Sequence, residues 1–323
     1  MKVAIYGAGA IGGWIGARLA LAGCDVGAVA RGATLEALQL HGLRLESTET
    51  VSAPVRSSAN PADLGVQDLV IVAVKAPAMA EVAKAIGPLI GPDTMVFTAM
   101  NGVPWWFFEG FGNKYARTRL KAVDPDGAIA RAIPAKHIIG CVVHASCSLN
   151  SPGFVKQHFG NKLIVGEPSG EKTARVKRLV ALLELAGFET VLSDQIQKDA
   201  WYKLWGNMTV NPVSAMTGAT TDLIMDDELV RGFISKVMLE AREIGGRIGI
   251  PIEQQPEGRH AITRKLGSFK TSMLQDVEAG KPVELDALVT VVKELGELTQ
   301  VPTPFTDALL GLSRLHARVH GLY

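Results

Sequence analysis

The sequence predicts an α/β protein in which a doubly wound parallel sheet occupies residues 1–194 and an all-helical domain occupies residues 195–323. Three observations lead to this prediction. The chain has 323 residues, which favours two domains over one. Short β-branched runs alternate with helical patterns up to about residue 192, and only helical periodicity follows them. Ser193 or Asp194 is expected to cap the first helix of the second domain.

The expected strands of the first domain are apolar on successive residues, as is typical of parallel strands covered by helices on both faces. They are KVAIYG, DVGAVAR, DLVIVAVK, TMVFTAMNG, HIIGCVVHASC and NKLIVGE. The stretch GFVKQHFGNKLIVGE is expected to add an antiparallel hairpin at the far edge of the sheet. In the second domain, periodicity predicts helices over 195–218, 226–248, 258–279, 283–299 and 304–318.

Composition and charge exclude several classes of function. Hydrophobic residues make up 47% of the chain and charged residues 20%, as in folded globular proteins. A net charge of +1 gives no overall attraction for nucleic acid or an anionic membrane. The apolar N-terminus lacks the basic leader of a signal peptide and contains Arg18, so we expect a cytoplasmic protein without a membrane partner. The three cysteines and seven histidines show no metal-ligand spacing, so no metal is expected. An apolar helical domain is compatible with a homodimer.

A glycine motif follows the first expected strand. Gly7, Gly9 and Gly12 come directly after VAIY and precede the helical pattern IGGWIGARLALAG. In a Rossmann-type domain the first glycine permits a tight turn, the second lets a pyrophosphate approach, and the third lets helix and strand pack closely. The helix N-terminus then faces the phosphates. The expected cofactor contacts here are Gly7, Ala8, Gly9, Ala10, Ile11 and Gly12. A glycine-rich turn without a ligand is the alternative.

The end of the second strand indicates which dinucleotide is bound. An acid at this place would hydrogen-bond the ribose 2′-hydroxyl of NAD, but no acid lies between Val26 and Thr34. The chain has Arg31 instead, whose guanidinium matches the 2′-phosphate of NADPH. We therefore expect NADPH as the cofactor. The alternative is a solvated surface arginine.

Two further side chains follow strands of the same sheet. Lys75 ends LVIVAVK, and Asn101 with Gly102 ends VFTAMNG, so both side chains are expected at the carboxyl edge, where ligands bind in open α/β sheets. Both are candidate cofactor contacts, and Asn101 is also a candidate substrate contact. For Lys75 the alternative is a strand-end charge in water.

A polar stripe is expected on the first helix of the second domain. Lys203, Asn207 and Asn211 are spaced by four residues and so share one face of a helix. The residues around them predict a largely buried helix; they are Trp201, Leu204, Trp205 and Met208. A polar stripe on a buried helix usually lines a site. The alternative is a solvated face on a helix that ends at Asn211-Pro212.

Over essentially its whole length the chain resembles the ketopantoate reductases, also called 2-dehydropantoate 2-reductases. The motifs that carry the resemblance are GAGAIG, Arg31, VKA, NG, KLWGNMTVNP and TSMLQDVEAGKPVELD. The resemblance implies that Lys203 is the catalytic lysine and that Glu284 pairs with the lysine and a substrate hydroxyl, beside the cofactor. It also implies that Asn207, Asn211 and Ser272 bind the substrate and that Asn101 is an active-site amide. The alternative for Glu284 is an exposed acid at a helix start.

The expected function is the NADPH-dependent reduction of ketopantoate, a small 2-oxo acid, to pantoate for coenzyme A. Lys203 would donate the proton as hydride reaches the keto carbon. A stretch over 105–130, rich in Trp105, Trp106, Phe107 and Phe108, departs from the family pattern. It is expected either to wall or cover the cleft or to pack as an extra core cluster or subunit contact. One alternative function is therefore a paralogue that reduces another 2-oxo acid. Another is a sensor that binds NADP(H) without turnover.

Overall fold

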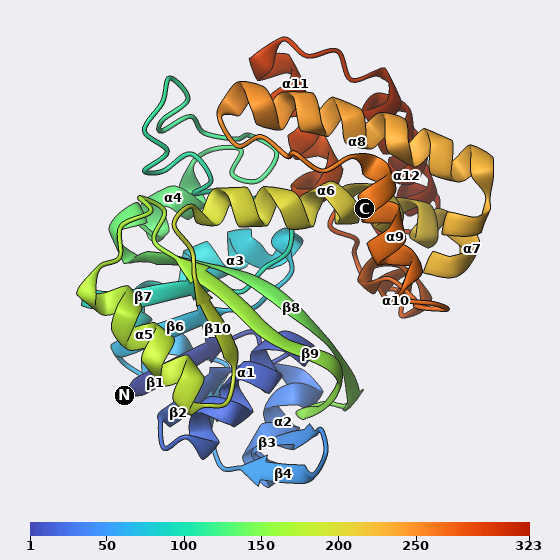
Figure 1. Ribbon diagram of the computed structural model, residues 1–323. Helices are drawn as coiled ribbons and strands as arrows, with labels where there is room; N and C mark the ends of the chain where they lie inside the picture. Colours follow the sequence, from blue (N-terminus) through green and yellow to red (C-terminus); the bar gives the residue numbers. More distant parts are fainter. The chain divides into compact units, whose positions relative to one another are not determined.

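The computed structural model describes all residues, 1–323, and the chain forms two compact units. Unit 1 comprises residues 1–100, 106–112 and 127–196, and unit 2 comprises residues 101–105, 113–126 and 197–323. The units are not consecutive halves, because two short segments that precede residue 194 associate with the helical unit. Figure 1 shows the strands of unit 1 in blue to green and the helices of unit 2 in yellow to red.

Unit 1 is built on a ten-stranded mixed sheet with the order β4-β3-β9-β8-β7-β6-β1-β2-β5, and β10 pairs with β9. The strands β5, β2, β1, β6, β7 and β8 are parallel to one another, which confirms the doubly wound sheet. The strand bounds are β1 Lys2–Tyr6, β2 Asp25–Val29, β3 Leu43–Glu46, β4 Thr50–Ala53, β5 Arg56–Ser58, β6 Gln67–Val72, β7 Ile90–Thr98, β8 Ile138–Ser151, β9 Phe154–Gly166 and β10 Glu189–Leu192.

The stretch expected to add an antiparallel hairpin is one strand, β9, which pairs antiparallel with β8, and its expected place at the edge of the sheet is wrong. Strand β3 pairs in parallel with the start of β9, and β4 pairs beyond β3. Both of these strands are short, and in β3 buried and partly exposed residues alternate. They therefore lack the continuous apolar run that predicts the central strands.

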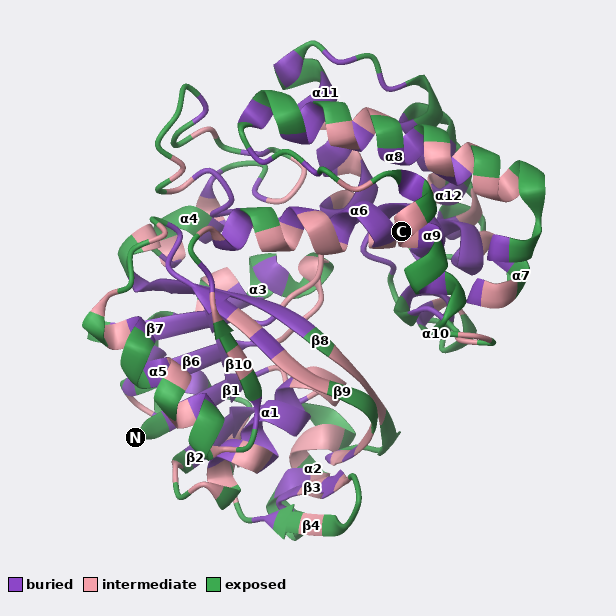
Figure 2. Ribbon diagram, in the orientation of Figure 1, coloured by how far each residue is buried: buried purple, intermediate pink, exposed green.

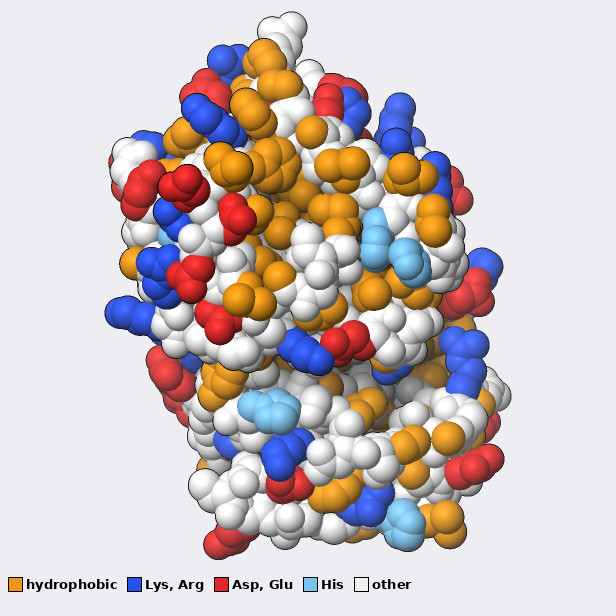
Figure 3. All heavy atoms as spheres, turned by 90° about the vertical axis from the view of Figure 1, so that its right-hand side faces the viewer, with side chains coloured by type: hydrophobic (Ala, Val, Ile, Leu, Met, Phe, Trp, Pro, Cys, Tyr) orange, Lys and Arg blue, Asp and Glu red, His pale blue; other side chains and the backbone are white.

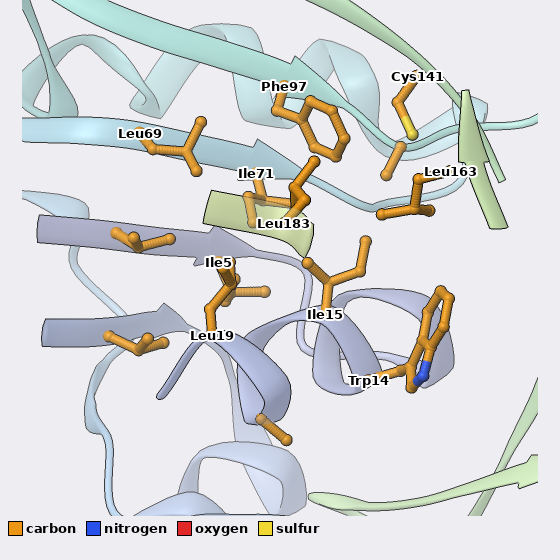
Figure 4. Close-up of a cluster of buried hydrophobic side chains, with 14 of the residues drawn as sticks. Ile5, Trp14, Ile15, Leu19, Leu69, Ile71, Phe97, Cys141, Leu163 and Leu183 are labelled. Carbon is orange, nitrogen blue, oxygen red and sulfur yellow. The ribbon is translucent and has the colours of Figure 1, made fainter. Parts of the chain in front are cut away.

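Helices cover the sheet, and α1 packs against it. Its bounds are Ala10–Leu21, and Trp14, Ile15 and Leu19 enter the core cluster with Ile5 of β1 and Ile71 of β6 (Figure 4). This contact explains why the segment is apolar. The other helices of unit 1 are α2 Gly32–His41, α3 Met79–Ala85, α4 Ala128–Ala132 and α5 Ala174–Leu185, with short 3-10 turns η1 Pro61–Asp63, η2 Ala76–Ala78, η3 Gly87–Leu89 and η4 Ala135–His137.

Unit 2 is helical, as expected. Its helices are α6 Ile196–Thr217, α7 Thr221–Asp226, α8 Glu228–Ile248, α9 Pro256–Arg264, α10 Ser272–Glu278, the π-helical turn η5 Asp286–Thr290, α11 Val291–Thr299 and α12 Pro304–Val319. The expectation of one helix over 258–279 is wrong, because α9 and α10 are separated by residues 265–271. In that segment Gly267 has a φ of 63°, which a helix does not tolerate. None of the helices is both long and apolar enough to cross a membrane.

The aromatic stretch after β7 packs inside the protein. Trp106, Phe107 and Phe108 are buried in unit 1, and the indole N–H of Trp106 donates a hydrogen bond of 3.1 Å to the hydroxyl of Thr98. The rings of Phe107 and Phe108 meet edge to face at 5.3 Å between their centroids. These side chains form an extra core cluster, one of the roles expected for the stretch.

The buried residues lie mainly in the sheet of unit 1 and between the helices of unit 2. Figure 2 shows the central strands of unit 1 and much of α6 as buried. Exposed apolar side chains gather on the helices of unit 2, and Figure 3 shows many hydrophobic side chains in its upper part. The largest exposures there belong to Leu229, Val319, Leu223, Leu312 and Leu315. A homodimer stays a prediction.

Candidate functional site

The glycine loop of unit 1 has the geometry that a dinucleotide pyrophosphate requires. Strand β1 ends at Tyr6 and α1 begins at Ala10. Gly7 has a φ of 99°, which only glycine adopts readily, so the chain turns sharply here. A Cβ on Gly12 would overlap the carbonyl oxygen of Gly7, so this glycine allows the helix to pack tightly against the turn. A Cβ on Gly9 would have no protein atom within 4 Å, so the space beside it is open.

The first turn of α1 is available to an anion. Its N-cap, Gly9, offers no side-chain hydrogen bond, and the first turn contains no acidic residue. The backbone N–H groups of a first helical turn lack partners within the helix. Together with the positive end of the helix dipole, they favour a phosphate group. The tight turn, the open space and the free helix start therefore fit a bound dinucleotide.

Arg31 lies beside this loop, as expected. It is the exposed N-cap residue of α2, two residues after β2, and the last residue of β2 pairs with Tyr6. Burial raises the pKa of Tyr6, and the charge of Arg31 opposes that shift. The guanidinium is thus close enough to the end of β1 to act on it electrostatically. Its place at the end of the second strand is where an adenosine ribose would carry its 2′-phosphate.

Lys75 reaches the same edge of the sheet from the other side of β1. Strand β6 pairs with β1 so that Val72 lies opposite Tyr6, and Lys75 follows three residues later. It is partly buried at this edge, and its contact with a cofactor stays a prediction. The structure therefore brings the glycine loop, Arg31 and Lys75 together around the carboxyl end of β1.

The catalytic candidates meet in unit 2. The ammonium of Lys203 on α6 donates a hydrogen bond of 2.8 Å to the side-chain oxygen of Asn101. Asn101 belongs to unit 2 although it follows β7 by only a few residues. A lysine and an amide that are 102 positions apart in the chain are thus placed in direct contact.

The segment after Asn101 explains how this contact is held. Gly102 has a φ of 83°, and a Cβ there would lie 2.5 Å from the carbonyl oxygen of Ala287. The N–H of Val103 donates to the same oxygen at 2.9 Å. Because Ala287 lies in the π-helical turn η5, the Asn-Gly pair is anchored to the turn that follows Glu284. The role of Ala287 was not predicted, because it rests on a backbone carbonyl, which leaves no signal in the sequence.

Glu284 is buried immediately before this turn. It is 7% exposed, and its neighbours Val283 and Leu285 are buried as well. The alternative of an exposed acid at a helix start is therefore wrong. The backbone bond from the N–H of Leu288 to the carbonyl oxygen of Glu284 places the glutamate on the first turn of the helical segment. π-Helical turns such as η5 occur often at functional sites.

The stripe on α6 also has the expected form. Lys203 and Asn207 are partly buried and Asn211 is buried, while the apolar residues around them are buried too. The helix continues through Pro212 to Thr217, so the alternative of a helix end at Asn211-Pro212 is wrong. The indole N–H of Trp205 donates a hydrogen bond of 2.7 Å to the carbonyl oxygen of Met238, which fixes α6 against α8. The three polar residues therefore lie on a rigid, largely buried helix.

Ser272 is the one candidate in unit 2 that stands apart. It is exposed at the first position of α10, where the hydroxyl of Thr271 caps the helix by accepting a hydrogen bond of 3.2 Å from the N–H of Leu274. The Ser272 hydroxyl makes no hydrogen bond with the other candidate residues. Its role in substrate binding stays a prediction.

Comparisons with known proteins agree with this arrangement. Residues 3–170 match the model of the family described as ketopantoate reductase PanE/ApbA, and residues 195–317 match the model of its C-terminal domain. A 2-dehydropantoate 2-reductase of Mesorhizobium japonicum is 46% identical over 325 residues, which cover 100% of both chains.

Two solved structures are also similar. One, provisionally named a ketopantoate reductase of Ralstonia solanacearum MolK2, has a TM-score of 0.96 and 56% identity and covers 100% of this chain and 99% of its own. The other is a 2-dehydropantoate 2-reductase of Geobacter metallireducens GS-15, with a TM-score of 0.85 and 27% identity over 98% of this chain and 99% of its own. With the glycine loop, the lysine-amide pair and the buried glutamate in place, the chain belongs to the ketopantoate reductase family.

Proposed function

We propose that this protein reduces 2-dehydropantoate to pantoate with NADPH as the electron donor. The observation that carries the proposal is the hydrogen bond from Lys203 to Asn101, because it places a proton donor in a fixed position. A relative with 46% identity over the full length bears the name of this activity.

Lys203 is the proton donor in this proposal. Reduction of a 2-oxo acid forms a C–H bond at the carbonyl carbon and an O–H bond at the carbonyl oxygen. An ammonium group has three N–H donors, and one of them is engaged by the oxygen of Asn101. In this proposal an N–H of the ammonium donates to the substrate oxygen, stabilises its developing negative charge and then protonates it.

Asn101 acts by orienting the lysine. Its side-chain oxygen accepts from the ammonium, and the Gly102–Ala287 contact holds the backbone that carries it. A flexible four-carbon side chain is thereby restricted to one direction, which lowers the entropy lost on reaching the transition state. Glu284, buried near the same anchoring turn, is proposed to accept a hydrogen bond from the substrate hydroxyl.

The remaining polar residues of unit 2 bind the substrate in this proposal. Asn207 and Asn211 lie one and two turns beyond Lys203 on the same face of α6. Their amide groups, with the hydroxyl of Ser272, are neutral donors suited to a carboxylate. They orient the 2-oxo acid so that its carbonyl oxygen meets the lysine.

The residues of unit 1 are proposed to hold NADPH. The loop from Gly7 to Gly12 would receive the pyrophosphate, while Arg31 would pair with the 2′-phosphate and Lys75 would contribute a further positive charge. When it is bound, the cofactor supplies the hydride for the carbonyl carbon. The protein residues position both reactants and provide the proton.

The test is NADPH oxidation by the purified protein with 2-dehydropantoate and with a panel of other 2-oxo acids. We expect turnover of 2-dehydropantoate, and a loss of at least about 100-fold in kcat for Lys203→Ala, the contribution typical of a general acid. Lys198→Ala is the matched control, because Lys198 is exposed on the same helix. NADPH binding should persist in both variants.

Turnover of only another 2-oxo acid would reassign the substrate. Binding of NADPH without turnover of any of the acids would refute the proposed reaction and favour a sensor.

A further inference from the structure

One arginine of α9 has a buried guanidinium nitrogen without a hydrogen-bond partner. Arg259, in the first half of α9, makes no side-chain hydrogen bond and no ion pair, and its Nε atom is buried without a partner. The neighbouring arginines of α8 and α9 differ in this respect. Arg231, Arg242 and Arg264 all donate to carbonyl, amide or carboxylate oxygens. A buried donor without an acceptor costs free energy, so its retention calls for a function.

The Arg259 guanidinium is held against α6. Its carbon lies 5.2 Å from the ring centre of Tyr202, so the cation stacks on the aromatic ring. The Tyr202 hydroxyl donates a hydrogen bond of 2.7 Å to the side-chain oxygen of Gln254, which fixes the ring. The arginine side chain therefore has a defined seat, although it has no hydrogen-bond acceptor there.

Gly206 forms the floor of this seat. A Cβ at this position would lie 2.6 Å from the Arg259 Nε and 2.8 Å from one of its terminal nitrogens, so any larger residue would displace the guanidinium. A glycine inside a helix is unfavourable by roughly 0.5–1 kcal/mol relative to alanine. Glycine therefore weakens α6 at the point where the arginine contacts it, which indicates that the position of the charge matters.

The seat adjoins the polar stripe of α6. Gly206 is three residues after Lys203 and directly precedes Asn207, so the guanidinium rests on the turn that carries both residues. The groups assigned above to the substrate carboxylate are neutral. A fixed guanidinium is the planar donor that pairs best with a carboxylate.

We infer that Arg259 is a substrate-binding residue that supplies the positive charge for the carboxylate of the 2-oxo acid. This inference rests on the proposed function, because it concerns the same substrate on α6. The terminal N–H groups of Arg259 donate to the substrate carboxylate, while Asn207 and Asn211 set the direction of the substrate. The arginine makes the site selective for acids over esters and amides of the same shape.

The first experiment compares Arg259→Gln with the matched control Arg264→Gln, which removes a charge from the same helix at its exposed end. In Arg259→Gln we expect KM for 2-dehydropantoate to rise about 10- to 100-fold, the range for a lost charge-assisted hydrogen bond, with little change in KM for NADPH. Arg259→Lys should recover part of the loss. The control should behave like the wild type.

A second measurement separates charge recognition from a structural role. Inhibition by 3-methyl-2-oxobutanoate should weaken in Arg259→Gln, whereas inhibition by its uncharged methyl ester should not. Gly206→Ala should weaken inhibition by the acid in the same way, because the added methyl group displaces the guanidinium while alanine favours the helix. Equal losses for acid and ester, or an unchanged KM in Arg259→Gln, would overturn the inference.

If the wild-type protein reduces no 2-oxo acid, the proposed function fails separately. Calorimetric titration with pantoate then decides the inference, since binding needs no turnover. Weaker binding of pantoate by Arg259→Gln than by the wild type would support it. Equal binding by both proteins, or no binding by the wild type, would overturn it.

Discussion

The glycine loop allows one substitution to be tested at two places with opposite expected results. Gly9 and Gly12 are three residues apart at the start of α1, and both are replaced by alanine. At Gly12 the new Cβ overlaps the carbonyl oxygen of Gly7 and lies 3.0 Å from the Cβ of Ala73. At Gly9 the new Cβ meets no protein atom within 4 Å, and the backbone, with φ −79° and ψ −160°, suits alanine.

The two variants should therefore differ in stability. Overpacking a well-packed contact costs about 1–3 kcal/mol, and backbone atoms cannot rotate away, so Gly12→Ala should lose stability in the upper part of that range. Each kcal/mol corresponds to roughly 2–4 °C in the melting temperature of a domain of this size. The free energy of unfolding of Gly9→Ala should lie within about 1 kcal/mol of the wild-type value, because alanine restricts the unfolded chain only slightly more than glycine does.

Cofactor binding, by contrast, should be weakened by the substitution at Gly9. In Gly9→Ala the methyl group occupies the open space beside the first turn of α1, where the pyrophosphate would lie. Loss of one or two charge-assisted hydrogen bonds predicts an increase of about 10- to 100-fold in the Kd for NADPH without loss of fold. Thermal unfolding and NADPH titration of both variants provide the measurement. A destabilised Gly9→Ala, or a Gly9→Ala that binds NADPH like the wild type, would refute the reasoning.

Three further predictions concern charge. Replacing Arg31 with alanine should raise KM for NADPH about 10- to 100-fold and leave KM for NADH unchanged; equal effects on both cofactors would contradict a role at the 2′-phosphate. Glu167 is 3% exposed and accepts from Arg175 at 2.7 Å, so Glu167→Gln should lower the free energy of unfolding by about 3 kcal/mol in urea, whereas exposed Glu171→Gln should not. Burial lowers the pKa of His260 below its ordinary 6.5, chiefly by desolvation. The unfolded chain then binds the proton more readily, so stability contributed by neutral His260 is present above pH 6.5 and is lost as the pH falls toward the lower folded pKa. Urea unfolding across this range should show a smaller acid loss for His260→Gln, and an identical loss would disprove the assignment.

Local patterns in the sequence were sufficient to predict much of the fold, the glycine loop and the polar stripe of α6. The apolar runs of β1, β2, β6 and β7 predict a parallel sheet because such strands must be buried on both faces. The spacing of Gly7, Gly9 and Gly12 fixes the turn between β1 and α1, since each glycine meets a steric requirement within a few residues. The four-residue spacing of the α6 stripe likewise follows from helix geometry.

Features that depend on distant contacts were not predictable in this way. The short strand β3 pairs with the edge that β9 offers, β4 pairs with β3, and the segment 265–271 interrupts a pattern that otherwise predicts one helix. Neither case leaves a local signal that outweighs the apolar periodicity around it.

The sequence by itself determined the fold class, the glycine loop and the polar stripe of α6, because these follow from short-range sterics and periodicity, while the catalytic roles were implied by the family resemblance. Only the tertiary structure decided that Asn101 contacts Lys203, that Glu284 is buried beside Ala287, and that Arg259 rests unpaired on Gly206. Each of these contacts joins residues more than 50 positions apart or depends on burial. Such contacts are set by how helices pack in three dimensions, and a pattern of neighbouring residues does not contain that information.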